Sequence, residues 1–223
     1  MVPLRAFAGL AFLLAVLAIA LFASAGTLSY WEAWVFLGVF ASATSAITID
    51  LATRDPALLV RRMKGGPTAE PRWSQRILQS FASLAFVAVF VVSGLDHRRG
   101  SAGMPLAVEL AGDALVALGL LVIFLVFRAN TFTSATIEVE HDQRVISTGP
   151  YAVVRHPMYA GALLMLLGVP LSLGSWWALL PVAVLAVVIA ARLLDEEQML
   201  SANLAGYAEY RRVVRCRLVP FVW

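Results

Sequence analysis

Charged side chains are scarce in this sequence: they make up 14% of its 223 residues, whereas hydrophobic side chains make up 61%. A soluble domain carries roughly a quarter charged residues. With a mean hydropathy of +0.82, the chain has too few polar side chains to cover a water-facing globule, which excludes a soluble enzyme. The same apolar excess excludes a disordered chain. At this length we expect one integral membrane domain, residues 1–223, with an all-α fold.

Cysteine and histidine are also scarce. Cys216 is the only cysteine, so neither an intrachain disulfide nor a cysteine-based metal site can form. His97, His141 and His156 fall in separate loops of the expected fold without metal-ligand spacing, so we expect no metal. The net charge of +3 is too small to indicate a nucleic-acid partner. No G-x-G-x-x-G sequence occurs, which excludes a Rossmann-type nucleotide site.

Long apolar runs are abundant. A transmembrane helix needs about 20 mostly apolar residues, and such runs lie at about 6–24, 31–49, 77–95 and 106–127. A fifth region, 157–194, is too long for one span. It contains residues that indicate a tight turn, followed by aromatic residues typical of a membrane interface: Gly168, Pro170, Gly174 and Ser175, then Trp176 and Trp177. We therefore expect a polytopic bundle of about six spans, the last two forming a helical hairpin.

The first run has an alternative interpretation as a signal peptide, because Ala23-Ser24-Ala25 resembles a cleavage site. The run is longer than a usual signal-peptide core and is preceded by Arg5 alone among basic residues, so we favour a span.

The distribution of charge predicts sidedness. With six spans and both termini inside, Arg98 and Arg99 lie outside, which leaves 15 of the 17 Lys and Arg residues on the inner side. Cytosolic loops carry such an excess, so we expect both termini and the active site to be cytosolic. The basic loop 53–75 is expected to set topology and to contact the lipid bilayer, not to take part in catalysis.

Two polar stretches, 128–156 and 195–217, lie on this inner side and are joined by the predicted hairpin. We expect them to form a capped pocket at the mouth of that helical pair. Pro157 suits the first turn of a helix, whose free N–H groups attract an anion, and Arg155 adds donors for it. The alternative is that Arg155 and His156 simply mark the membrane boundary.

The triplet Asp195-Glu196-Glu197 is expected at the end of the last span, where the helix dipole disfavours negative charge. Arg192 lies four residues before Glu196, on the same helix face, and can pair with it. A cationic ligand would also balance these carboxylates. The alternative is a solvated acidic cap with one salt bridge.

Four tyrosines are expected at the same level of the membrane, as interfacial anchors or as ligand contacts: Tyr151, Tyr159, Tyr207 and Tyr210. Gly149-Pro150 predicts a turn that directs Tyr151 toward the pocket. Residues around Tyr207 and Tyr210 predict a cytosolic amphipathic helix over its mouth. Gly161 is expected to permit close packing of the hairpin partner.

Taken together, these motifs resemble a known family. Gly149-Pro150-Tyr151, then Arg155-His156-Pro157-Met158-Tyr159 and Gly161, followed by Glu196-Glu197, Tyr207 and Tyr210, resemble the signature of the isoprenylcysteine carboxyl methyltransferases. Relatives of this family include phospholipid N-methyltransferases. The resemblance covers about 128–223 and implies that this part is the cofactor-binding and catalytic region, whereas 1–127 forms N-terminal spans.

The resemblance implies S-adenosylmethionine-dependent methyl transfer to a lipophilic or small acceptor, whether carboxylate, thiol or amine. It implies that the cofactor is bound by Gln143, Arg144, Val145, Ile146, Tyr151, His156, Pro157, Met158, Tyr159 and Glu196. It implies that Arg192 holds an anionic group of the acceptor and that the catalytic set is Arg155, Arg192, Glu196 and Glu197. A thiol or amine acceptor would need a general base, for which Glu197 and His156 are the candidates.

Two other functions stay open. Membrane sterol-type reductases share the Arg-His-Pro-x-Tyr run and use NADPH, whose 2′-phosphate requires extra basic residues, for which loop 53–75 is a source. A non-catalytic membrane protein of the same fold is the other alternative.

Overall fold

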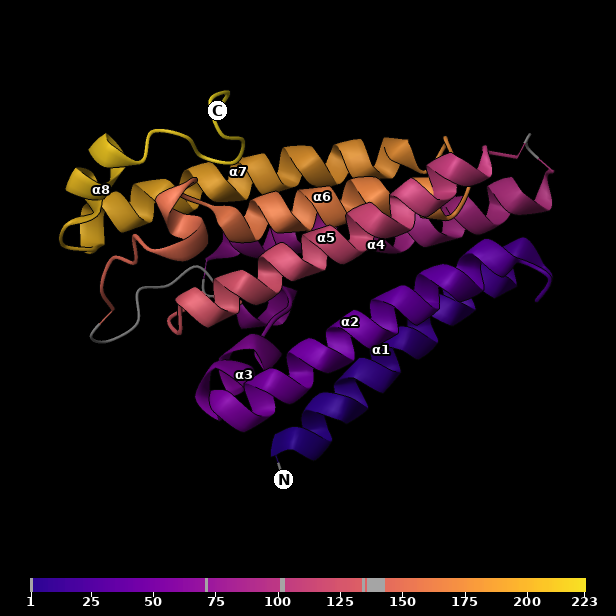
Figure 1. Ribbon diagram of the computed structural model, residues 1–223, viewed down its shortest axis with the longest axis horizontal. Coiled ribbons are helices and arrows are strands. Elements are labelled where there is room, and N and C mark those ends of the chain that lie inside the picture. Colours follow the sequence, from indigo (N-terminus) through magenta and orange to yellow (C-terminus); the bar gives the residue numbers. More distant parts are fainter. Residues whose placement is uncertain (1, 71, 101–102, 134, 136–142) are drawn as a thin grey trace.

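The computed structural model describes residues 2–70, 72–100, 103–133, 135 and 143–223, and within these ranges all regular structure is helical (Figure 1). This confirms the predicted all-α fold. The helices are α1 (Val2–Ala25), α2 (Trp31–Arg54), α3 (Pro56–Met63), α4 (Trp73–Arg98), α5 (Leu106–Ala129), α6 (Pro157–Ser172), α7 (Leu179–Asn203) and α8 (Tyr207–Val213), with 3₁₀ turns η1 (Pro67–Ala69) and η2 (Gly149–Ala152).

Four helices of the described part are long and apolar enough to cross a membrane: α1, α2, α4 and α5. They coincide with the four apolar runs of the sequence. The fifth region forms the predicted hairpin, in which α6 has 16 residues and α7 has 25. Gly174 adopts a left-handed φ of 65° in the turn between them, a conformation that glycine tolerates without a steric penalty.

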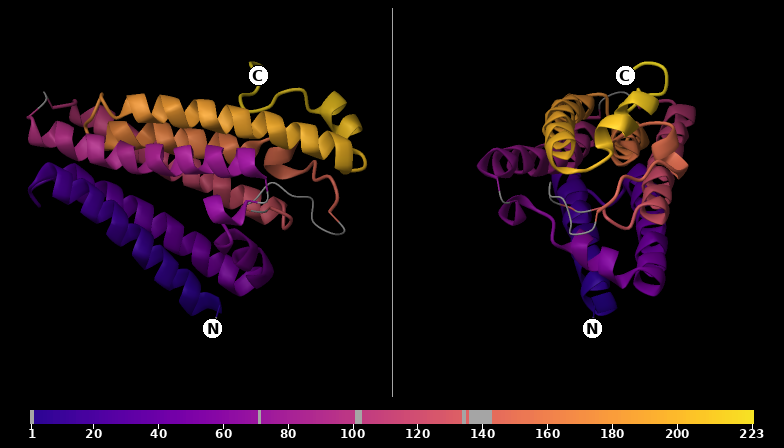
Figure 2. Two further views of the ribbon diagram at one scale, coloured as in Figure 1. Left: turned by 180° about the vertical axis from the view of Figure 1, so that it is seen from behind. Right: turned by 90° about the vertical axis from the view of Figure 1, so that its left-hand side faces the viewer.

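The six long helices form a ring. Each contacts its neighbours in the order α1, α2, α5, α6, α7, α4 and back to α1, and this ring is visible along its axis (Figure 2). The chain thus brings α4 of the N-terminal half against α7 of the C-terminal half. The ring order explains how residues far apart in sequence come to share one site.

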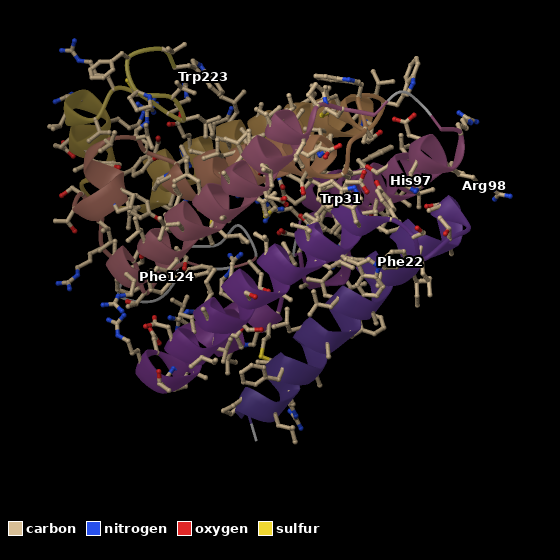
Figure 3. The ribbon with its side chains drawn as sticks, turned by 45° about the vertical axis from the view of Figure 1, so that its right-hand side comes forward. Phe22, Trp31, His97, Arg98, Phe124 and Trp223 are labelled. Atoms are coloured by element: carbon tan, nitrogen blue, oxygen red, sulfur yellow. The ribbon has the colours of Figure 1, made fainter. Side chains whose placement is uncertain are left out.

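The two ends of the ring differ. One end, called the basic end below, carries the start of α1, the helices α3 and α8 and the start of α6 (Figure 1). The opposite end carries the connectors after α1 and α6, and Trp31, His97 and Arg98 lie there (Figure 3). Trp176 and Trp177 are exposed at that end, as expected of interfacial aromatics.

The hydrophobic core fills the half of the ring away from the basic end. Its members come from all six long helices and include Leu21, Phe36, Phe90, Val116, Leu173 and Val182. A smaller cluster joins the end of α7 to α8 and includes Leu204, Tyr207 and Tyr210. The basic half between these two clusters is the part of the ring that is free to hold a ligand.

Glycines allow α5 and α6 to pack closely. A Cβ placed on Gly168 would lie 2.6 Å from the carbonyl oxygen of Gly112, and one on Gly119 would lie 2.6 Å from that of Gly161. Small residues on facing helices permit such close backbone approach. The prediction that Gly161 packs against the hairpin partner is therefore wrong, because Gly161 faces α5 instead of α7.

Candidate active site

A cavity of about 970 Å³ occupies the basic half of the ring. Typical small-molecule pockets measure roughly 300–1,000 Å³, so this cavity is large enough for a cofactor and part of a second ligand. Its deeper wall is mainly apolar and includes Phe12, Leu13, Ala82, Phe86, Ile123, Leu185, Val188 and Ile189. Its other end is polar and includes Asn130, Gln143, Arg144, Tyr151, His156, Tyr159, Arg192 and Glu196.

The predicted meeting of stretches 128–156 and 195–217 is confirmed, because both contribute to this cavity. Of the residues that the motifs singled out, Gln143, Arg144, Val145, Ile146, Tyr151, Arg155, His156, Met158, Tyr159, Arg192 and Glu196 line it. Pro157 and Glu197 lie outside the lining. Helices α1 and α4 and the connector after α3 also contribute to the wall.

Helix α6 begins at Pro157, as predicted, and its first turn faces the cavity. The earliest helical hydrogen bond runs from the N–H of Ala160 to the carbonyl of His156 over 3.1 Å. The N–H groups of Met158 and Tyr159 precede it and have no acceptor in their own helix. Together with the positive end of the helix dipole, they suit a carboxylate or phosphate.

The three neighbouring carboxylates of α7 have different partners. Asp195 accepts from Gln75 over 2.7 Å and pairs with Arg72. Glu196 accepts a 2.6 Å hydrogen bond from the hydroxyl of Tyr159, and among the described residues it forms no ion pair. Glu196 is therefore the carboxylate left to balance a cationic ligand in the cavity.

Glu197 is buried behind this wall. It lies 2.6 Å from Nε of Arg155, 2.8 Å from Nε of Arg217 and 3.4 Å from Nε2 of His156. Helix α7 continues to Asn203, so the triplet lies within the helix and the expected dipole penalty at its end does not apply. The alternative of a solvated acidic cap with one salt bridge is wrong as well.

The guanidinium of Arg155 is not free to donate to an anion in the cavity, which corrects the prediction. Its Nε binds Glu197, and its Nη1 donates to the carbonyls of Val214 and Arg215 over 2.9 and 2.6 Å. The backbone N–H groups of Arg155 and His156 donate to the carbonyls of Cys216 and Arg217. Arg155 therefore fastens the C-terminal segment to the start of α6.

Arg192 does not pair with Glu196, which corrects the i,i+4 prediction. Its Nη2 lies 2.5 Å from Oε1 of Glu70 and donates to the carbonyl of Ala135, and its Nη1 donates to the side-chain oxygens of Gln75 and Gln79. Glu70 is almost fully buried, so its carboxylate competes for the guanidinium of Arg192 more effectively than the part-exposed carboxylate of Glu196. The guanidinium lines the cavity but is already held by four protein groups.

The connector after α3 is part of the site, although its sequence was interpreted as a topology determinant. Gly65 and Gly66 of the connector line the cavity together with Arg62 of α3, and Glu70 of the connector pairs with Arg192. The signal that could have revealed this is the polar pair Gln75 and Gln79, which lie four residues apart on one face at the start of α4.

The tyrosines of η2 and α8 close the polar end. Asn130 donates to the hydroxyl of Tyr151 over 3.0 Å, and the hydroxyl of Tyr210 donates to the carbonyl of Tyr151 over 2.7 Å. Burial raises the pKa of Tyr151 to about 12 and also raises the pKa of Tyr207 and Tyr210. All three hydroxyls therefore stay protonated near neutral pH and can donate.

Tyr207 is buried against the cavity, and its hydroxyl has no hydrogen-bond partner within the described ranges. A buried donor without an acceptor is costly, which indicates that a ligand group accepts a hydrogen bond from this hydroxyl.

The expected turn at Gly149-Pro150 and the helix over the mouth are both confirmed. Among the residues that the structure describes, no group of three or more His, Cys, Asp or Glu is arranged to hold a metal; His141 lies outside them.

Comparison with known proteins agrees with this site. A comparison with curated proteins finds no match. The family model described as phospholipid methyltransferase matches residues 108–205, a segment that runs from the first turn of α5 to the end of α7 and contains η2, α6 and most of the cavity's polar end. This segment is therefore similar to the integral membrane methyltransferases, the family that its motifs indicated.

Proposed function

We propose that this protein transfers a methyl group from S-adenosylmethionine to a lipophilic acceptor. The observation that supports this most strongly is the continuity of one cavity, which joins a polar end beside α6 and Glu196 to an apolar wall along α1, α4 and α7. A charged cofactor and a greasy acceptor need such a site, because their reacting atoms must meet while the rest of each molecule lies in a different environment.

The polar end fits the charges of S-adenosylmethionine, which has a carboxylate, an ammonium and a sulfonium. The free N–H groups in the first turn of α6 suit the carboxylate, and Glu196 suits one of the cations. The unpartnered hydroxyl of Tyr207 offers a further donor. When bound, the cofactor supplies an electrophilic methyl group on its sulfonium.

The apolar wall fits the acceptor. Phe12 of α1 and Val87 of α4 both line the cavity and are exposed on the outside of the ring, so the wall continues into the surface that would face lipid. An acceptor can therefore enter sideways between α1 and α4 and align its head with the polar end. Alignment of two reactants supplies up to about 7–11 kcal/mol of rate acceleration, and α8 over the mouth excludes water.

His156 is the residue placed to accept a proton from a thiol or amine acceptor. It lines the cavity, and its Nε2 lies 3.4 Å from Oε1 of Glu197, whose other partners are two arginines. Glu197 is thus held in an ion-pair network and orients His156, whereas His156 itself faces the ligand. A carboxylate acceptor would need no such base.

The basic end, with the active site, lies on the cytosolic side by the positive-inside rule.

The test is to incubate the purified protein, reconstituted in lipid, with methyl-labelled S-adenosylmethionine and extracted membrane lipids and thiols. We expect label in a lipophilic product whose mass rises by one methyl group. Binding of NADPH without binding of S-adenosylmethionine would favour a reductase, and binding of neither would favour a non-catalytic protein.

A further inference from the structure

A second depression lies on the other side of Arg155 from the cavity. It measures about 460 Å³ and is lined by Ala208 and five arginines: Arg155, Arg211, Arg212, Arg215 and Arg217. We call it the arginine pocket. It shares only Arg155 with the lining of the methyl-transfer cavity, and the family match ends before α8, so neither the cavity nor the family match accounts for it.

The positive charge of the arginine pocket is only partly balanced. Arg155 and Arg217 share the single carboxylate of Glu197, and Arg211 donates to the hydroxyl of Ser201 over 3.0 Å. The side chains of Arg212 and Arg215 are exposed and have no ion pair or hydrogen bond with any described residue. Glu209 lies on α8 but outside the lining.

Several guanidinium groups around one depression repel each other unless an anion lies between them. Phosphate is the anion that best matches them, since its oxygens accept paired hydrogen bonds from the planar guanidinium. An anion in this pocket would relieve the repulsion among the arginines and bind through at least Arg212 and Arg215, which have no partner among the described residues.

The surroundings indicate where the phosphate comes from. After α8 the chain turns back along α7, with Trp223 near its end (Figures 2 and 3). The end of α8 exposes Val213, and this segment exposes Phe221 and Val222, a few residues in sequence from the arginines of the pocket; Phe221 is fully exposed at a left-handed φ of 65°. Exposed apolar side chains beside a basic cluster are typical of segments that lie in the headgroup region of an anionic membrane.

We propose that the arginine pocket binds the phosphate of an anionic phospholipid headgroup. Bound there, the headgroup braces the C-terminal segment, which already holds the start of α6 through the bonds from Arg155 and His156 to Cys216 and Arg217. The lipid therefore keeps α8 over the cavity. The binding itself does not depend on the methyl-transfer proposal and can be measured without it.

The test uses the full chain, purified in a neutral detergent, and its thermal unfolding midpoint. The probes are short-chain phosphatidylglycerol, short-chain phosphatidylcholine and inorganic phosphate. Because a ligand that binds only the folded state stabilises it, phosphatidylglycerol should raise the midpoint in a saturable way, and the other two should not. The variant R212Q/R215Q should need about tenfold more phosphatidylglycerol for half the effect.

The control is R98Q/R99Q, which removes the same charge at the opposite end of the ring and should respond like the unaltered protein. An equal response of R212Q/R215Q and of the unaltered protein would overturn the site. An equal response to phosphatidylcholine would show that the headgroup charge is irrelevant, and a response to inorganic phosphate alone would replace the lipid with a free anion. Either result overturns the proposal.

Discussion

Arg192 of α7 and Glu70 of the connector between α3 and α4 form an ion pair, with 2.5 Å between Nη2 and Oε1. The same guanidinium binds Gln75 and Gln79 of α4 and the carbonyl of Ala135. One side chain thus joins α7, α4 and two connectors around the polar end of the cavity. This arrangement assigns Arg192 to positioning the wall, because an anionic acceptor would have to displace Glu70 to reach it.

Removing the charge of Glu70 should therefore destabilise the protein. Loss of one partner of a buried ion pair leaves the other charge uncompensated, at a cost of about 3–5 kcal/mol. We expect Glu70→Gln to lower the thermal unfolding midpoint clearly in detergent. Glu209→Gln, on the exposed face of α8, is the control and should change stability by less than about 0.5 kcal/mol. Equal midpoints for the two variants would contradict the assigned role.

The adjacent glutamates of α7 should respond in opposite ways. Glu196→Gln should weaken S-adenosylmethionine binding by about tenfold or more, because a charge-assisted contact is lost, and should leave the unfolding midpoint nearly unchanged. Glu197→Gln should lower the midpoint, because Arg155 and Arg217 lose their shared carboxylate. Binding titrations and melting curves of both variants distinguish the roles, and the reverse pattern would show that they are exchanged.

Two tyrosines of α8 offer a second matched pair. Tyr210→Phe removes the hydrogen bond to the carbonyl of Tyr151 and should cost about 0.5–1.5 kcal/mol of stability. Tyr207→Phe removes a hydroxyl that has no partner among the described residues, so it should not reduce the stability of the ligand-free protein. It should instead weaken cofactor binding. A stability loss in Tyr207→Phe as large as in Tyr210→Phe would contradict this.

The close contact of α5 and α6 gives a prediction about packing. Gly168→Ala places a Cβ 2.6 Å from the carbonyl of Gly112, so the helices must separate and the protein should unfold at a lower temperature. Gly38→Ala on α2 is the control, because its Cβ would meet nothing within 4 Å. Similar melting curves for both variants would show that α5 and α6 can move apart without cost.

Periodicity and turn chemistry were sufficient to predict the long helices but not α3 (Pro56–Met63), which lies within the stretch 53–75 that was expected to be a loop. The apolar runs predicted α1, α2, α4 and α5, and Gly174 with Ser175 predicted the turn of the hairpin. These features depend on local sequence, since an apolar run long enough to cross a bilayer must be helical. The residues that line the polar end of the cavity were predictable for a similar reason, because each of the motifs that contain them is a short continuous stretch of sequence.

The partners of the charged residues were not predictable in this way. Arg192 was expected to pair with Glu196 on its own helix but binds Glu70, which lies 122 positions earlier in the sequence. Gly161 was expected to face α7 but packs on α5. Such contacts depend on the order of helices around the ring, and hydrophobic periodicity carries no information about that order.

The most direct test of the account is equilibrium binding of S-adenosylmethionine to the purified protein, with NADPH as the competitor of a different class. The account predicts saturable binding of S-adenosylmethionine that excess NADPH does not displace and that Glu196→Gln weakens. Saturable binding of NADPH with no binding of S-adenosylmethionine would contradict the assignment of the cavity.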